Sequence, residues 1–393
     1  MLPSRIRSVG TQVILLLIFF LIQNVSLGQS KGDLVKIKKI DSLIRKLIAG
    51  EHSPGFALGI QVRDEEPIIK VYGFADLRNH VKVTLSHQFR IASVTKPFTA
   101  VAILKLVELG KLSLEDKIDK FFPTYPNGEN IAIYHLLSHT SGIPNWWEGQ
   151  MPANVPGSFP MCDSPHRYLQ QMKNHALFLP GKFYKYSNSG YVLLGEILEK
   201  VAGQKYEEFL AAHIFKSAGM TSTEMEHIND PSEKWVKGYA IDSSKNSPFI
   251  DPLVYPMPFS AGGLRSNASD LLKFFSALKA GKIVSPALFS KMISYALLNS
   301  GRPVYEGGYR APGAKPAGVH ADMERRGYGL GFHLMDLYKT PVYYHSGGIA
   351  GFNSYLMHIP ANNTTIVLLA NAEDGIIPAL KDIRKIATEI GRE

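Results

Sequence analysis

The stretch Ser93-Val94-Thr95-Lys96-Pro97 opens the part of the sequence that decides the fold. The residues that follow, 97–109, are apolar on nearly every side of a helix. A helix that is apolar all round is buried, and proline is tolerated only in the first turn of a helix. The stretch therefore predicts a buried helix that begins close to Ser93 and ends at Gly110.

Ser93 and Lys96 are spaced so that one can act on the other. Serine is a weak nucleophile at neutral pH and needs a nearby base. Positions i and i+3 share a helix face, so Lys96 can reach the Ser93 oxygen. A residue at a helix start also has a free backbone N–H at the positive end of the helix dipole, which favours an alkoxide and an oxyanion. We predict that Ser93 is a nucleophile and Lys96 its base; the alternative interpretation of Ser93 is a plain helix cap.

A second Ser-x-x-Lys match, Ser276-Ala277-Leu278-Lys279, occurs late in an amphipathic segment that ends at Gly281. The backbone N–H of Ser276 would be bonded inside that helix and could not stabilise an oxyanion. Its context therefore favours Ser93 as the reactive serine.

Tyr186-Ser187-Asn188 is the second candidate motif and lies in a loop that leads directly into a helix over 191–201. A tyrosine can relay a proton if a neighbouring cation lowers its pKa, and Lys96 would be such a cation. Asn188 can donate to a substrate carbonyl. The similar Tyr125-Pro126-Asn127 falls in a Pro-Asn-Gly turn, which explains it without a functional role.

His345-Ser346-Gly347-Gly348 is the third candidate and follows a strand over 342–345. Paired glycines let the backbone approach a ligand closely and leave an N–H to act as an oxyanion donor. His345 would be mostly neutral at pH 7. In isolation, a histidine satisfied by hydrogen bonds at a strand end is the alternative interpretation.

Strand patterns occur at both ends of the chain, with mostly helical patterns between them. This order predicts an α+β fold: one antiparallel sheet built from both ends, flanked by terminal helices, with a helical lobe inserted over roughly 112–300. The segments that carry this prediction are the helix 35–48, the hairpin 56–63 and 67–74, the helices 131–137, 191–201 and 268–278, the strands 342–345, 352–359 and 365–370, the turn at 362–363, and a final helix from 375.

The composition is that of an ordinary globular protein, with 45% hydrophobic and 20% charged residues in 393. The net charge is +9, but lysines are scattered among acids, as over 111–120, so nucleic-acid binding is not indicated. The length suits one large catalytic domain over 29–393.

Residues 1–28 read as an export signal. Arg5 and Arg7 precede an apolar run over 13–22 that is too short to span a bilayer comfortably, and Ser26 and Gly28 suit a cleavage site. We therefore expect a secreted or periplasmic protein with no stable membrane insertion after cleavage; an uncleaved anchor is the alternative.

No cofactor is expected. The sole cysteine, Cys162, allows neither an intramolecular disulfide nor a cysteine-based metal site, and we interpret it as structural or incidental. The sequence contains 13 histidines but no His-Glu-x-x-His motif. It also contains no phosphate-binding loop and no dinucleotide-binding fingerprint. His135 and His139 are four residues apart without an obvious third ligand, and His139 is expected to cap a turn.

The three motifs, in this order, resemble those of the serine β-lactamase and penicillin-binding-protein superfamily. Within it the chain looks like the branch of class C β-lactamases, D,D-peptidases and esterases. The resemblance extends over roughly residues 35–390. It includes three connecting stretches, Gly110-Lys111-Leu112-Ser113-Leu114-Glu115-Asp116, His135-Leu136-Leu137-Ser138-His139-Thr140-Ser141-Gly142 and Ala261-Gly262-Gly263-Leu264-Arg265-Ser266.

This resemblance implies a role for each motif. Ser93 would be acylated, Lys96 and Tyr186 would share the work of the general base, and Tyr186 would activate the hydrolytic water. Asn188 would position the acyl group. The third motif, from His345 and Ser346 through Gly347 and Gly348, would bind substrate. The N–H groups of Ser93 and Gly348 would form the oxyanion hole.

His345 departs from class C β-lactamases, which usually have lysine there. A neutral imidazole attracts a carboxylate less than an ammonium does, so the sequence favours an esterase, amidase or peptidase acting on a small ester, amide or peptide. The alternatives are a true β-lactamase and a protein that binds or senses penicillin or peptidoglycan peptides without turnover. Trp146-Trp147 is expected either to line the pocket or to pack beneath the loop.

Overall fold

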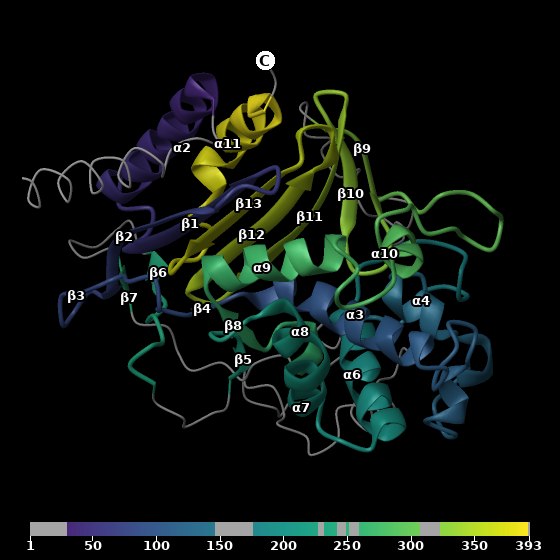
Figure 1. The fold of residues 1–393 in the computed structure, drawn as a ribbon. Helices are drawn as coiled ribbons and strands as arrows, with labels where there is room; N and C mark the ends of the chain where they lie inside the picture. The colour runs from purple at the N-terminus through teal and green to yellow at the C-terminus, as the bar shows by residue number, and fades with distance from the viewer. Residues whose placement is uncertain are drawn as a thin grey trace, which may run out of the picture.

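Strands from the two ends of the chain meet in the middle of one sheet (Figure 1). The computed structural model describes residues 30–145, 176–226, 232–241, 249–250, 259–306 and 323–391. In it, β1 (Gly55–Val62) pairs antiparallel with β13 (Thr364–Ala370), so that Phe56 lies opposite Ala370. The predicted antiparallel sheet, closed by both chain ends, is confirmed.

The sheet has eight strands in the order β3-β2-β1-β13-β12-β11-β10-β9, all paired antiparallel. The other strands are β2 (Ile68–Asp76), β3 (Val81–Lys82), β9 (Met323–Tyr328), β10 (His333–Leu337), β11 (Thr340–Ile349) and β12 (Phe352–Ile359). Neither β9 nor β10 was expected. The sequence of β9, Met-Glu-Arg-Arg-Gly-Tyr, lacks apolar alternation, and its pairing with β10 places it at the sheet edge.

Side chains alternate across the sheet and supply two cores. Leu58 and Leu368 face the terminal helices α2 (Lys31–Ala49) and α11 (Ile377–Glu389), which pack together on one face (Figure 1). Ala57 and Leu369 face the opposite core, which includes the central helices. Gly59 lies directly beneath α9 (Ala268–Lys279), where a Cβ would come 3.0 Å from Leu272.

The helical lobe covers the second face and surrounds α3 (Thr95–Glu108), the predicted buried helix. Its other α-helices are α4 (Ile133–Leu137), α6 (Asn188–Ala202), α7 (Tyr206–Leu210), α8 (Lys216–Ala218) and α10 (Pro286–Met292). Single turns of other helix types are η2 (Ala92–Val94), η3 (Ile118–Lys120), η4 (Gly128–Asn130), η5 (Ala211–Phe215), η6 (Phe259–Ala261) and η7 (Pro360–Asn362). Short strands complete it: β4 (Phe89–Arg90), β5 (Glu224–Met225) and β8 (Leu264–Ser266) in one sheet, and β6 (Ala240–Ile241) with β7 (Phe249–Ile250).

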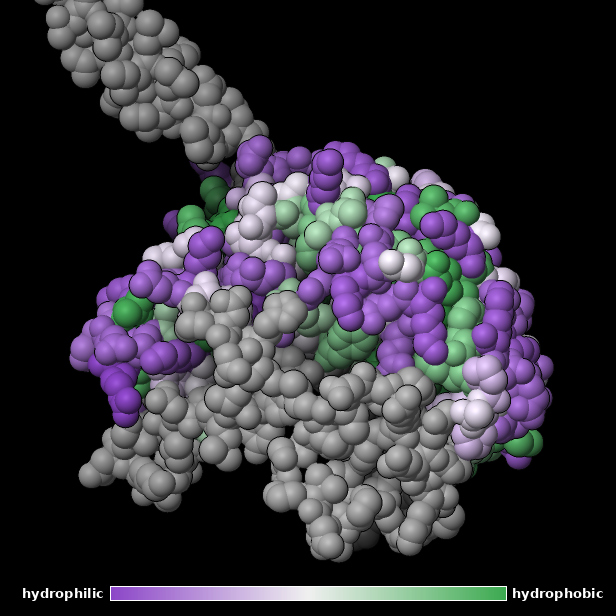
Figure 2. Space-filling view, turned by 90° about the horizontal axis from the view of Figure 1, so that it is seen from below, coloured by the Kyte–Doolittle hydropathy of each residue, from purple (hydrophilic) through white to green (hydrophobic). Residues whose placement is uncertain are grey.

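The described residues include no helix long and apolar enough to cross a membrane. On the face seen in Figure 2, hydrophilic residues predominate among the coloured atoms, with hydrophobic residues interspersed. The expected signal over 1–28, Trp146-Trp147 and Cys162 lie outside the described residues.

Candidate active site

Ser93 lies in the tight turn η2, immediately before α3 begins at Thr95. Pro97 falls in the first turn of that helix, as predicted. The preceding residue, Ala92, has a left-handed backbone with φ of 45°, a strained conformation for a residue other than glycine. The turn is held to the sheet by Ser354, whose Oγ donates to the carbonyl oxygen of Ile91 at 2.7 Å. Ser93 itself is half-buried, so a ligand can reach it.

Lys96 is completely buried behind Ser93. Its Nζ lies 3.0 Å from Ser93 Oγ, 2.6 Å from Asn188 Oδ1 and 2.7 Å from the carbonyl oxygen of Ala261. Three separate parts of the chain therefore converge on one amine.

Burial disfavours the charged form of this amine, and the three contacts can also serve the neutral form. Burial lowers the pKa of Lys96 well below its usual range. Without the extra proton, Nζ has two N–H donors and one lone pair. Asn188 Oδ1 and the Ala261 carbonyl can only accept, so they take the two donors, and the lone pair is left for the Ser93 hydroxyl.

Tyr186 lies on the other side of Ser93. Its hydroxyl is hydrogen-bonded to Ser93, and Lys96 Nζ lies 4.8 Å from the centre of its ring. The expectation that Lys96 lowers the pKa of Tyr186 is wrong here. Burial raises the pKa of Tyr186 above its usual range, an effect that the bond to Ser93 only reduces, because a desolvated phenolate has little to stabilise it beside a neutral amine.

The second motif is positioned by the start of α6. Ser187 caps this helix by accepting from the backbone N–H of Gly190, so its role in the motif is structural. Asn145 holds the residues on either side: its Nδ2 donates to the carbonyl oxygen of Tyr186, and its Oδ1 accepts from the N–H of Asn188. Asn188 Oδ1 accepts from Lys96, so Asn188 Nδ2 remains to donate to a ligand.

His139 supports the same loop from behind. Its Nδ1 accepts from the backbone N–H of Ser187 at 3.1 Å, and its ring packs 4.3 Å from that of Tyr186. Burial lowers the pKa of His139 well below its usual range, which keeps it the neutral acceptor that this contact needs. The side chain was expected to cap a turn, and it instead holds a loop 48 residues away.

The third motif is contributed by β11. His345 is buried and both of its ring nitrogens are engaged: Nδ1 donates to the Ser346 carbonyl oxygen at 2.8 Å, and Nε2 accepts from the Tyr328 hydroxyl at 3.2 Å. Burial lowers the pKa of His345 well below its usual range. His345 is thus a neutral residue with a fixed tautomer, and no ring nitrogen is left for a substrate carboxylate.

The two glycines after Ser346 differ in their surroundings. A Cβ on Gly347 would lie 2.3 Å from the Ile91 carbonyl oxygen and 3.0 Å from the Ser93 nitrogen, so only glycine lets β11 approach the turn that carries Ser93. Gly348 is exposed and faces open space. These positions suit an oxyanion hole made by the N–H groups of Ser93 and Gly348.

The two rival motifs, at Ser276–Lys279 and Tyr125–Asn127, do not belong to this site. Lys279 Nζ binds Asp64 and Asn363, and not the neighbouring Ser276. Tyr125 is a buried residue in a turn that continues through Asn127, whose φ is 61°. Within the described ranges, no group of three or more His, Cys, Asp or Glu side chains is arranged to hold a metal ion.

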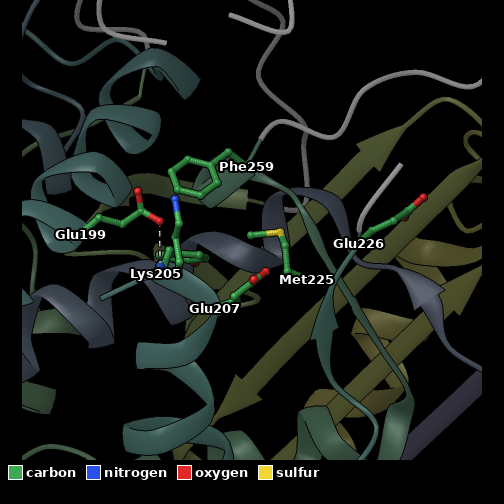
Figure 3. A pocket seen from close by; sticks show the side chains of 7 residues that line it. Glu199, Lys205, Glu207, Met225, Glu226 and Phe259 are labelled. Carbon is green, nitrogen blue, oxygen red and sulfur yellow. Dashed lines mark hydrogen bonds between the residues drawn. The ribbon is translucent and has the colours of Figure 1, made fainter. Parts of the chain in front are cut away.

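The described residues of the candidate site and its surroundings line two pockets. One, of about 290 Å³, is lined by residues that include Tyr186, Arg326, His333 and Ser346, and lies directly beside the second and third motifs. The other, also about 290 Å³, is lined by residues that include Glu199, Lys205 and Phe259, which lie together in Figure 3, and Met225 and Glu226 across from them.

One residue of the pocket in Figure 3 belongs to the turn that contacts Lys96. Phe259 begins the turn η6 whose Ala261 accepts from Lys96, and its φ of 43° is again strained. Glu199 accepts from the N–H of Tyr206, while Glu226 is clamped by Arg90 and Arg265. These acids are therefore bound within the protein.

No role was predicted for Ala261, Tyr328 or Asn145, and His139 was predicted only to cap a turn. Any residue can supply a backbone carbonyl, so the contact from Ala261 could not be predicted from residue type. The Ala-Gly-Gly stretch indicates only that the backbone closely approaches another part of the protein there. His139 had a signal in the stretch 135–142, but its target, the N–H of Ser187, is 48 residues away.

Comparison with known proteins agrees with this geometry. Residues 40–388 match the family model described as Beta-lactamase. The chain belongs to the β-lactamase family. This β-lactamase-family chain is 29% identical to penicillin-binding protein 4* of Bacillus subtilis (strain 168) over 77% of its length, and 26% identical to protein flp of Staphylococcus aureus (strain MW2) over 87%. It spans 65% and 64% of those proteins, respectively.

Solved structures share the fold. The octameric penicillin-binding protein homologue from Pyrococcus abyssi has a TM-score of 0.72 and 27% identity, covering 90% of this chain and 77% of that one. D-amino acid amidase from Ochrobactrum anthropi SV3 has a TM-score of 0.66 and 25% identity, covering 87% and 97%. The family match and these neighbours agree on the family and the fold of this chain.

Proposed function

We propose that this protein is an exported serine hydrolase that cleaves an ester or amide bond through an acyl-serine intermediate. The observation that carries the proposal is the buried Nζ of Lys96, which lies 3.0 Å from Ser93 Oγ and also contacts Asn188 and Ala261, and whose pKa burial lowers well below its usual range. A capping serine would need no such base.

The contacts support a two-step reaction. As Ser93 Oγ attacks the substrate carbonyl carbon, its proton passes to Lys96 Nζ, and the oxyanion is held by the N–H groups of Ser93 and Gly348. When the intermediate collapses, the bond to the leaving group breaks. The leaving group takes a proton from the Tyr186 hydroxyl, and Lys96 returns one to Tyr186.

Hydrolysis of the acyl-enzyme repeats the sequence with water. The water oxygen attacks the acyl carbon, its proton passes through Tyr186 to Lys96, and Ser93 Oγ recovers a proton as it leaves. Tyr186 acts as a relay and not as a phenolate, since burial raises its pKa. Asn188 Nδ2 would hold the acyl carbonyl side of the substrate throughout.

An esterase or D-amino-acid peptidase or amidase activity fits this chain better than antibiotic hydrolysis. The buried, internally bonded His345 offers no ammonium to a β-lactam carboxylate. A solved D-amino acid amidase shares the fold at 25% identity, which supports testing D-amino acid amides as well as esters.

A covalent serine probe tests the proposal. A fluorophosphonate should add one adduct to the wild-type protein and none to Ser93→Ala, as measured by intact mass, while Ser276→Ala should react like the wild type. Absence of the adduct, or equal labelling of Ser93→Ala, would overturn the assignment. A panel of p-nitrophenyl esters, D-amino acid amides, D-alanyl peptides and a chromogenic cephalosporin then ranks the substrates, and rapid cephalosporin turnover would make the protein a true β-lactamase.

A further inference from the structure

The helix α2, which covers the sheet on the face away from α3, is strongly basic (Figure 1). It has five lysines and one arginine but only two acids, Asp33 and Asp41. Both acids are used within the protein: Asp33 is buried and accepts from the backbone N–H of Gly391 at 2.7 Å, and Asp41 accepts from Tyr72 and Lys70. The exposed charged residues of α2 are therefore all basic.

Four of these basic residues form a row along the outer side of the helix: Lys31, Lys38, Lys39 and Lys46 are all exposed. Because successive residues turn by about 100°, the four lie within an arc of about 100°. The opposite side of α2 holds Ile40 and its apolar neighbours against the sheet. The lysine row is thus carried on a fixed helix, and it is about 22 Å long at 1.5 Å per residue.

The lysine row is not neutralised within the part of the chain that the structure describes. No ion pair or side-chain hydrogen bond joins any of its four ammonium groups to a described residue. Other lysines are paired: Lys105 lies 2.8 Å from Glu108, and Lys120 lies 3.1 Å from Asp116. The row therefore differs from a surface on which the two signs of charge alternate.

Exposed charges on neighbouring elements leave this surplus in place. The helix α11, which packs against α2, exposes two basic and two acidic residues, which cancel: Lys381, Lys385, Asp382 and Glu389. The first exposed acid that follows the row in the sequence is Glu51, beyond the end of α2 at Ala49. The outer face of the two terminal helices is thus positive along α2.

Charges spread along a straight, fixed row suit an extended anionic surface better than a single small anion. The sequence indicates which surface lies nearby. The apolar run of the expected export signal ends at Ile22, nine residues before Lys31. Nine residues span at most about 32 Å, so a bilayer that holds this run before cleavage lies close to the start of α2.

Resting on the export that is part of the proposed function, we propose that the lysine row of α2 docks the protein on the anionic headgroups of a phospholipid bilayer. The docking is peripheral, because the apolar side of α2 is buried against the sheet and does not enter the lipid. Ile91 and Val94, on either side of Ser93, pack in the core on the other face of the sheet. Docking through α2 therefore leaves the reactive serine on the far side of the sheet.

Co-sedimentation with vesicles tests this surface. The protein is purified after export from the expressing cells, so that it has whatever N-terminus export leaves. It is mixed either with vesicles of equal parts phosphatidylglycerol and phosphatidylcholine or with vesicles of phosphatidylcholine alone. An apolar N-terminus would bind both kinds, whereas the lysine row should make the wild type prefer the anionic vesicles.

Two changes should remove this preference. A lysine near an anionic surface strengthens binding about fivefold, so the double variant Lys38→Gln, Lys39→Gln should bind the anionic vesicles about 25-fold more weakly. Raising the salt from about 0.1 M to about 1 M should abolish the preference of the wild type, because the screening length falls from about 10 Å to about 3 Å.

A matched variant controls for net charge. Lys216→Gln with Lys282→Gln removes two exposed lysines from the helical lobe and should bind the anionic vesicles as the wild type does. Ser93→Ala should also bind normally, since docking does not use the nucleophile. Both lysine variants should hydrolyse a soluble p-nitrophenyl ester at the wild-type rate.

Three results would overturn the docking surface: equal binding of the wild type to both kinds of vesicle, equal weakening in the matched variant, or a preference that persists at about 1 M salt. Retention on immobilised polyphosphate without binding to anionic vesicles would also overturn it, and would assign the row to a soluble polyanion. An unreactive Ser93 refutes the hydrolase alone, because the vesicle measurement does not depend on turnover.

Discussion

The carbonyl oxygen of Ala261 accepts a hydrogen bond from Lys96 Nζ at 2.7 Å, although the two residues are 165 positions apart. A carbonyl can only accept, so this contact takes one N–H of the amine permanently. Together with Asn188 Oδ1 it directs the remaining lone pair of a neutral lysine to Ser93. The base is thus oriented by acceptors, and burial lowers its pKa well below its usual range.

Replacing Lys96 should remove the base without removing the nucleophile. We expect Lys96→Ala to lower kcat by at least ~100-fold, since positioned acid–base groups contribute about that much. Lys96→Arg should not restore activity, because a guanidinium keeps its proton. Steady-state hydrolysis of a p-nitrophenyl ester measures both, with Lys279→Ala as the matched control in the rival motif. Near-normal kcat in Lys96→Ala would contradict the assigned role.

The pH profile should report the charge on Lys96. Acylation needs the neutral amine, so kcat/KM should rise with pH as Lys96 loses its proton and then level off. Because burial lowers the pKa of Lys96, this rise should be complete well below pH 10. An uncharged ester is the substrate of choice, since it does not titrate itself. A rate that falls over the same range would show that the protonated lysine is the active form.

The two glycines of the third motif should respond differently to the same substitution. Gly347→Ala would force a Cβ to within 2.3 Å of both the Ile91 carbonyl oxygen and Ser354 Oγ, at a cost in stability of about 1–3 kcal/mol. Gly348→Ala meets open space and should unfold at the wild-type temperature. Thermal unfolding of the pair gives the comparison, and equal melting temperatures would show that β11 does not approach the turn so closely.

Acid should weaken the attachment of α2 to the sheet through Asp41. Burial would raise the pKa of Asp41, but bonds from Tyr72, Arg45 and Lys70 lower it to about 2. Because the pKa of Asp41 is lower in the folded than in the unfolded state, its ionised form stabilises the fold. This stabilisation is complete at pH values above the unfolded pKa, near 3.8, and is lost as the pH falls toward the folded pKa of about 2. Asp41→Asn should therefore cost about 1 kcal/mol at pH 7, allowing for solvent screening, and almost nothing near pH 2.

Urea unfolding of the wild type and Asp41→Asn at pH 7, 5 and 2.5 measures this difference. A difference that stays constant across the series would assign the contribution of Asp41 to packing and not to its charge.

The sequence allowed prediction of the elements whose patterns are local. The apolar segment after Ser93 and the strands 352–359 and 365–370 were predicted to within two residues, because apolar and aromatic residues bounded by turn residues give a local signal. β9 was missed because charged residues fill this edge strand. β10, His-Leu-Met-Asp-Leu, was missed because five residues are too few to show a strand pattern.

In the candidate site, too, residues with a local sequence signal were predicted and residues that depend on distant contacts were not. Ser93, Lys96, Tyr186 and Asn188 were identified because residue type and spacing carry their chemistry, and the structure brings them together. The pKa of Tyr186 was expected to fall, since the sequence indicates a nearby lysine but not the burial that keeps this lysine neutral. Carbonyl acceptors and neutral histidines, which complete the site, depend on distances that only the folded chain defines.

The pairing of β1 with β13 also determines when activity can arise during synthesis. Ser93 and Lys96 leave the ribosome early, but the acceptor at Ala261, the glycines of β11 and the last strand of the sheet follow much later. Until then, we expect Lys96 to be solvated and protonated, and the serine beside it to be unreactive. A nascent chain should therefore be inactive until β11 and β13 have folded, and a nonsense mutation that removes β13 should leave an intact nucleophile without a base.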